Sequence, residues 1–141
     1  MILLDTNVIS EVMRPAPAQA VLEWFAGQAS SDLYLPAIVE AELRFGILLL
    51  PDGKRRNGLA TALEGMIEED FAGRILPFDS LAARSYAVIA AQRRRSGRAV
   101  KEADCQIAAI AASRGAALAT RNVKDFEDAE IEILNPWVHG A

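Results

Sequence analysis

The chain has 141 residues, 52% of them apolar, and a formal net charge of −4. This length suits one domain with its own core, and the single cysteine excludes both an internal disulfide and a cysteine-based zinc site. The only histidine, His139, lies two residues from the C-terminus, which argues against a Ser-His-Asp triad or a histidine-rich metal site. Carboxylates must therefore carry any chemistry, and they suit hard cations such as Mg²⁺ or Mn²⁺.

No apolar run approaches the ~20 residues that span a membrane, and the N-terminus lacks the pattern of a signal peptide. We expect one domain over residues 1–141, located in the cytoplasm, with no membrane partner. The negative charge argues against an avid nucleic-acid binder, unless a local basic patch lies over an acidic site.

The N-terminus combines a short apolar strand with polar residues. Residues 2–4 show no alternation of polarity, as in a strand that is covered on both faces of a parallel sheet. Asp5 would follow at the carboxyl end of this strand, where open α/β sheets bind ligands. Thr6 and Asn7 would begin a helix at the same place. The alternative is that Asp5 only caps this helix.

Helices and strands then alternate along the chain. The expected helices cover residues 6–13, 19–26, 37–50, 59–71, 80–96 and 102–114, and the expected later strands cover 33–35, 74–78, 116–120 and 131–134. Strands separated by helices predict an α/β sandwich with a mainly parallel central sheet.

Glu42 is a candidate site residue because of its neighbours at helical spacing. It shares a predicted stripe with Ile38, Phe45 and Leu49. A carboxylate on an apolar stripe is costly unless it is paired or bound to metal. The alternative is a glutamate at the rim that reaches solvent or pairs with Arg44.

The helix over residues 80–96 ends in a basic cluster. Its members are Arg93, Arg94, Arg95 and, beyond the helix, Arg98 and Lys101. Cations suit the C-terminus of a helix, which is their structural explanation. The cluster exceeds what capping requires, so the four arginines are candidates for binding the phosphates of a ligand.

Polar residues meet again after the strand over residues 116–120. The segment 121–126 follows it, and in a parallel sheet this segment would lie at the same edge as Asp5. Asp104, which opens the preceding helix, and Glu42 could reach that edge as well. The sequence therefore predicts that these side chains converge.

The converging side chains are mostly acidic: Asp5, Glu42, Asp104, Asn122 and Asp125. Carboxylates a few ångströms apart repel, so such a cluster needs a cation or a shared proton. Mg²⁺ would keep several waters and leave positions for a phosphate oxygen and an attacking water. Two ions roughly 3.5–4 Å apart could stabilise both oxygens of a phosphodiester cleavage.

Four short motifs, in this order, resemble those of PIN-domain ribonucleases, and most closely those of the VapC/FitB-type toxins of bacterial toxin–antitoxin pairs. The motifs are Leu-Leu-Asp5-Thr6-Asn7, Glu42 within Val39-Glu40-Ala41-Glu42-Leu43, Glu102-Ala103-Asp104 before Ile107-Ala108-Ala109, and Thr120-Arg121-Asn122-Val123-Lys124-Asp125-Phe126. The closing Leu134-Asn135-Pro136-Trp137 adds to this likeness. The resemblance covers essentially the whole chain and implies a three-layer α/β/α sandwich.

The resemblance also implies an activity and partners. It implies a Mg²⁺- or Mn²⁺-dependent endoribonuclease, a homodimer, inhibition by a VapB-like antitoxin, and contact with operator DNA only through that antitoxin. Asp5 and Asp104 match the principal metal ligands and Glu42 the third acid, which would orient or deprotonate the attacking water. Thr6 and Thr120 would orient carboxylates.

The sequence departs from the family pattern at one position. Asn122 stands where many members have a fourth aspartate, and Asp125 could take a place near the metal or accept a water. The chain could therefore be a weakly active or inactive binding module. A phosphoacceptor receiver domain, suggested by Asp5 with Lys101, lacks the acidic pair expected on the first strand. We expect the antitoxin to cover an apolar face of the early helices and to push an arginine into the acidic site.

Overall fold

The computed structural model describes residues 1–138, so His139 lies outside the described part. A parallel sheet with the strand order β3-β2-β1-β4-β5 forms its centre. The strands are β1 (Ile2–Leu4), β2 (Leu33–Pro36), β3 (Ile75–Leu76), β4 (Ala117–Ala119) and β5 (Ile133–Leu134). The predicted α/β architecture with a mainly parallel sheet is confirmed.

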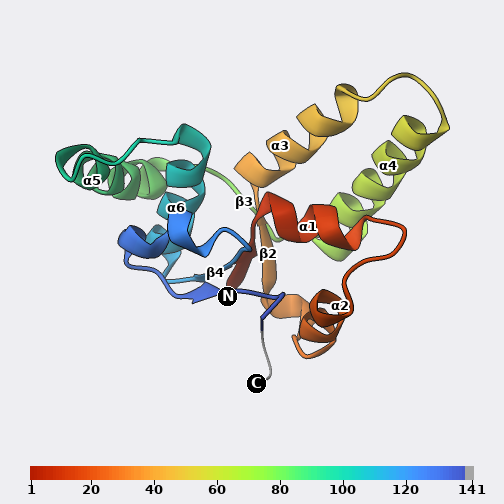
Figure 1. Ribbon diagram of the computed structural model, residues 1–141, viewed down its shortest axis with the longest axis horizontal. Helices are drawn as coiled ribbons and strands as arrows, with labels where there is room; N and C mark the ends of the chain where they lie inside the picture. Colours follow the sequence, from red (N-terminus) through yellow and green to blue (C-terminus); the bar gives the residue numbers. More distant parts are fainter. Residues whose placement is uncertain (139–141) are drawn as a thin grey trace.

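Helices cover both faces of the sheet. They are α1 (Thr6–Val12), α2 (Gln19–Ala26), α3 (Ala37–Leu48), α4 (Lys54–Gly65), α5 (Ser80–Arg95) and α6 (Glu102–Arg114). Figure 1 shows α5 and α6 on one side of the strands and α1 to α4 on the other. The strand order explains these three layers: the chain moves outward from β1 to β3 and then returns to β4, so right-handed crossovers place the later helices on the opposite face.

The start of α4 differs from the prediction of a helix over residues 59–71. The helix begins at Lys54, and Met66–Asp70 form a π-helical segment after it. Arg56 pairs with Asp52 one turn earlier, and the N–H of Asn57 donates to the carbonyl of Gly53. These local bonds draw the basic residues after the turn into the helix.

The core lies between the sheet and the two helical layers. Its largest fully buried side chains are those of Phe126, Leu3, Leu4, Ile9, Leu35, Leu63, Ile107, Ile110, Leu118, Val8, Val21 and Val39. The alanines of α6 at positions 108, 109 and 111 are also buried, which lets this helix approach the sheet closely. Cys105 is buried among them, as expected of a small core residue.

The predicted apolar stripe on α3 faces solvent instead of the core. Val39 and Leu43 form the buried face, whereas Phe45 is 65% exposed and Leu49 is 69% exposed. In Figure 1, α3 and α4 form a hairpin that extends away from the strands, so one face of α3 has nothing to cover it. The expectation that Glu42 sits on a buried apolar stripe is therefore wrong.

Among residues 1–138, no helix has both the length and the apolar character needed to cross a membrane.

Candidate active site

The candidate site lies where the strand order reverses. The chain leaves β1 in one direction and β4 in the other, and ligands of open α/β sheets bind at the carboxyl ends of such strands. Asp5 directly follows β1, and Thr120 directly follows β4. The backbone N–H of Asp5 donates to the carbonyl of Ala119 at 3.0 Å, so sheet pairing holds the two ends together.

Asp5 is held by several donors. Its carboxylate is 4% exposed and accepts from the backbone N–H of Thr6 at 2.8 Å and from the hydroxyl of Thr120 at 2.7 Å. The side-chain amide of Asn7 donates to the same oxygen as Thr120 does, at 3.2 Å. Asp5 is thus the N-cap of α1 and also a fixed member of the polar cluster, so the two readings of this residue are compatible.

Asn7 is a structural member of the site that the sequence suggested only as a helix cap. Its amide nitrogen also lies 3.4 Å from the hydroxyl of Thr120, and its carbonyl oxygen accepts from the backbone N–H of Arg121 at 3.1 Å. It therefore ties the loop after β1 to the loop after β4. In the sequence, this role of Asn7 was indicated only by its position two residues after Asp5, in the run Asp5-Thr6-Asn7.

Glu42 reaches the site from α3. The hydroxyl of Thr6 donates to its Oε1 at 2.7 Å. Arg44 instead pairs with Glu40 and Glu64, so the alternative of a Glu42–Arg44 pair is wrong. Thr6 thus contacts Asp5 through its backbone and Glu42 through its side chain, which places both carboxylates in one unit.

Asp104 stands in the first turn of α6, and its pKa is raised. Burial is the main cause, followed by the negative charges of Asp5 and Asp125, while Lys101 and Arg93 act in the opposite direction. Burial also raises the pKa of Asp5, against the lowering effect of its hydrogen bonds from Thr120 and Thr6, and Glu42 adds to the rise. The negative charges of Asp5 and Asp125 thus act on Asp104, and that of Glu42 acts on Asp5.

The β4–β5 loop (residues 120–132) contributes the remaining candidates. Asn122 is exposed, and its backbone N–H donates to the Thr120 hydroxyl at 3.0 Å. Its side-chain amide forms no hydrogen bond with any residue in the range 1–138. Asp125 is half-buried, with Oδ1 at 3.3 Å from the ammonium of Lys101.

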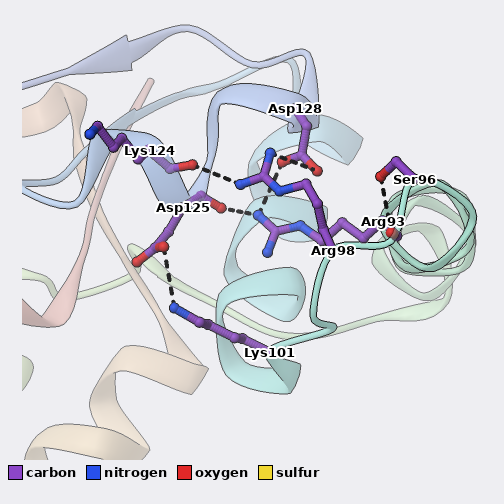
Figure 2. A network of polar contacts seen from close by, with 7 residues as sticks. All are labelled: Arg93, Ser96, Arg98, Lys101, Lys124, Asp125 and Asp128. Carbon is purple, nitrogen blue, oxygen red and sulfur yellow. Dashed lines mark hydrogen bonds and ion pairs between the residues drawn. The ribbon is translucent and has the colours of Figure 1, made fainter.

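The arginine cluster divides in the structure. Arg94 and Arg95 are exposed, as a phosphate-binding role requires. Arg98 is also exposed, and it contacts the β4–β5 loop through the Lys124 carbonyl at 3.0 Å. Arg93 is only 2% exposed and binds the loop from inside, as Figure 2 shows, so its prediction as an RNA-binding residue is corrected.

The donor set fits a hard divalent cation held by two carboxylates and water. Within residues 1–138, no group of three or more His, Cys, Asp or Glu side chains is arranged to hold a metal ion, so the prediction of Glu42 as a third metal ligand beside Asp5 and Asp104 is corrected. Asp5, Glu42 and Asp104 also lack an ion-pair partner among the described residues. Mg²⁺ commonly uses only one or two protein carboxylates, and a cation here would relieve the repulsion between Asp5 and Asp104.

A groove opens beside the carboxylates, between α1, α3 and α4. Its volume is about 930 Å³, and Glu42, Thr6 and Asn7 are among the residues that line it. Apolar side chains from α3 and α4 line much of the remainder. The guanidinium of Arg121 lies 5.0 Å from the ring centroid of Trp137, and both residues belong to the groove wall. No pattern in the sequence indicated that these two residues meet.

Comparison with known proteins agrees with this geometry. The family model described as PIN domain matches residues 2–132. A VapC ribonuclease of Sinorhizobium fredii is 50% identical over 97% of this chain and 98% of its own length. The toxin FitB of Neisseria gonorrhoeae is 46% identical over 97% of this chain and 99% of its own length.

Solved structures give the same result. The crystal structure of FitAcB from Neisseria gonorrhoeae superposes with a TM-score of 0.91 at 46% identity, covering 97% of this chain and 99% of that chain. The structure of FitAB bound to an IR36 DNA fragment has a TM-score of 0.93 at 43% identity, covering 100% of this chain and 99% of that chain. With the family model, the close relatives and the fold in agreement, this chain belongs to the PIN domain family.

Proposed function

We propose that this chain is a metal-dependent endoribonuclease that acts as the toxin of a bacterial toxin–antitoxin pair. The observation that carries the proposal is the pair Asp5 and Asp104. Asp5 directly follows β1 at the reversal point of the sheet, Asp104 stands in the first turn of α6, and the negative charge of Asp5 helps to raise the pKa of Asp104. Neither carboxylate has an ion-pair partner among residues 1–138. The names of the relatives, a VapC ribonuclease and the toxin FitB, support the same reaction class.

The residues divide the chemistry between them. A bound Mg²⁺ or Mn²⁺ would polarise the phosphate and lower the pKa of a coordinated water. Asp5 and Asp104 would hold this ion, with Thr120 and Asn7 fixing the orientation of Asp5. Glu42, oriented by the Thr6 hydroxyl, would align the attacking water or accept its proton.

The substrate and partners follow from the surfaces around the site. Arg94, Arg95 and Arg98 would contact the RNA backbone beside the acids. A VapB-like antitoxin would cover the exposed apolar face of α3, including Phe45 and Leu49, and would place an arginine among the carboxylates. In this proposal the toxin is a cytoplasmic homodimer with one domain over residues 1–141, and it reaches operator DNA only through the antitoxin.

One observation favours a second candidate function. Asn122 replaces a fourth acid of many family members, and within residues 1–138 its side-chain amide makes no hydrogen bond. A chain with reduced metal affinity would act as a binding module for the antitoxin and have little turnover. Measurement of metal-dependent cleavage separates the two functions.

The first test is cleavage of a mixed RNA pool by antitoxin-free protein, with Mg²⁺ or Mn²⁺ and with a chelator. Asp5→Asn and Asp104→Asn should each lower the rate by roughly 100-fold or more, because each removes a charged metal ligand. Asp32→Asn is the matched control, since Asp32 is exposed before β2, at the opposite edge of the sheet. Chelator-resistant cutting, or equal cutting by all variants, would contradict the proposal.

A further inference from the structure

Arg93 is a buried cation that the proposed reaction does not use. It lies in the last turn of α5, is 2% exposed, and points into the β4–β5 loop. Its guanidinium donates to the backbone carbonyl of Asp125, and its Nη2 lies 3.1 Å from Oδ1 of Asp128. Its Nε is buried with no hydrogen-bond partner among the described residues. An arginine is therefore held here although not all of its donors are satisfied.

Arg98 binds the same loop from the next segment. It donates to the Lys124 carbonyl at 3.0 Å, and its Nη1 lies 3.5 Å from Oδ2 of Asp128. The backbone N–H of Arg98 donates to the carbonyl of Arg93 at 2.9 Å. This bond joins the last turn of α5 to the segment that carries Arg98, so both arginines reach the loop from neighbouring backbone. In Figure 2 they approach the backbone of Lys124 and Asp125 together. The loop is thus fixed at its backbone as well as through Asp128.

The segment that these arginines bind carries a carboxylate of the acidic site. The side chain of Asp125 reaches Lys101, at 3.3 Å between Nζ and Oδ1, at the N-cap of α6. Asp104 stands in the first turn of the same helix, so the contact with Lys101 brings the Asp125 side chain to the end of α6 that carries Asp104. A shift of the Asp125 backbone would therefore change the distance between its carboxylate and Asp104.

We propose that Arg93 is a positioning residue of the active site, which fixes the Asp125 carboxylate beside Asp104 by binding the Asp125 carbonyl and the Asp128 carboxylate. This inference rests on the proposed function. Stability alone does not require an arginine here, because apolar side chains of similar volume often replace buried ion pairs without loss. Nη2 of Arg93 donates to both acceptors, and the planar guanidinium fixes the directions of these two bonds, which a freely rotating ammonium on a flexible stem does not.

The test uses Arg93→Lys in the full chain, which keeps the charge and removes the planar guanidinium whose Nη2 binds both acceptors. We expect the affinity for Mn²⁺, measured by electron paramagnetic resonance without RNA, to fall about 10- to 100-fold. The cleavage rate should fall by a similar factor. Circular dichroism should stay that of the wild type. Arg84→Lys is the control, because Arg84 is exposed on the same helix and makes no ion pair among residues 1–138. Its Mn²⁺ affinity and cleavage should not change.

A double-mutant cycle separates positioning from a general structural role. If Arg93 acts through Asp125, then Arg93→Lys should have little further effect on Mn²⁺ affinity in an Asp125→Asn background. If each substitution lowers Mn²⁺ affinity by its own factor and the two factors multiply in the double variant, the inference is overturned. Wild-type Mn²⁺ affinity in a folded Arg93→Lys variant would overturn it as well.

Asp128→Asn is the second variant if Arg93→Lys does not fold. It leaves Arg93 in place and removes the charge of its partner, so Mn²⁺ affinity should fall in the same direction by a smaller factor. An unchanged affinity would overturn the inference. A wild-type protein that neither binds Mn²⁺ nor cuts RNA would overturn the proposed function and this role with it. Binding by the wild type with unchanged variants would overturn the role of Arg93 alone.

Discussion

At the scale of single residues, the uncharged side chain of Thr120 connects as many residues of the site as the carboxylate of Asp5 does. Its buried hydroxyl donates to Asp5 and accepts from the side-chain amide of Asn7 and the backbone N–H of Asn122. One hydroxyl thereby fixes the direction of the Asp5 carboxylate and the start of the β4–β5 loop. Thr6 does the same between Asp5 and Glu42. Small hydroxyl residues thus set the geometry in which the acids act.

Thr120→Val should therefore impair both stability and activity. The variant keeps the shape of the side chain but leaves an oxygen of the buried Asp5 without this donor, which costs about 1–3 kcal/mol in the free energy of unfolding. Cleavage should fall roughly 10- to 100-fold because the orientation of Asp5 is lost. Urea unfolding and RNA cleavage measure the two effects.

Thr120→Ser is the control for this substitution, since it keeps the hydroxyl and loses only a methyl group. It should retain most of the activity and lose about 1 kcal/mol of stability. A valine variant as active as the serine variant would show that the hydroxyl does not orient Asp5.

At the scale of elements, α3 has one face that packs into the core and another that faces solvent. Val39 and Leu43 pack into the core, Glu42 projects toward the site, and Phe45, Leu48 and Leu49 remain exposed. An apolar helix face that stays exposed next to a groove indicates a surface for a partner. Glu42 and Thr6 are among the residues that line the groove between α1, α3 and α4, so a partner bound there would also contact the Glu42 carboxylate.

Phe45→Ser should separate partner binding from folding. Because Phe45 is 65% exposed, the free energy of unfolding should change by less than about 0.5 kcal/mol. Affinity for the co-purified antitoxin should fall at least about 10-fold, since buried aromatic side chains dominate interfaces. Isothermal calorimetry measures this affinity, and RNA cleavage by free toxin should not change.

Val88→Ser is the matched control for Phe45→Ser, because Val88 is 66% exposed on α5 in the opposite helical layer. It should leave antitoxin affinity unchanged. Equal losses from both substitutions would place the antitoxin elsewhere or on both layers.

At the scale of the whole molecule, the acidic centre is a source of instability in the metal-free protein. Burial raises the pKa of Asp5 and of Asp104 above the ordinary value of 3.8, so the folded chain binds these protons more tightly than the unfolded chain. The free energy of unfolding therefore falls as the pH rises from the ordinary carboxyl range through the raised pKa values. Above this range the ionised acids repel each other unless a cation is bound.

Thermal unfolding in chelator should reveal this dependence. Between about pH 4 and neutrality, the wild type should lose more stability than Asp104→Asn, because the variant lacks one of the titrating groups. Saturating Mg²⁺ at neutral pH should raise the wild-type midpoint, with about 2.7 kcal/mol of stabilisation at a hundredfold excess over Kd. Parallel curves for both proteins in chelator would contradict the assignment of Asp104 to the coupled acids.

The sequence alone determined the parallel α/β architecture and the acids at its carboxyl edge. Unalternating apolar strands and helix boundary residues are local signals, and parallel strands bring the residues that follow Leu4 and Ala119 to one edge. Only the tertiary structure decided which charged side chains remain exposed and can bind a ligand. It buried Arg93 against the β4–β5 loop and left the apolar face of α3 exposed. Both outcomes depend on which elements meet across long sequence separations, and helical periodicity gives no information on that.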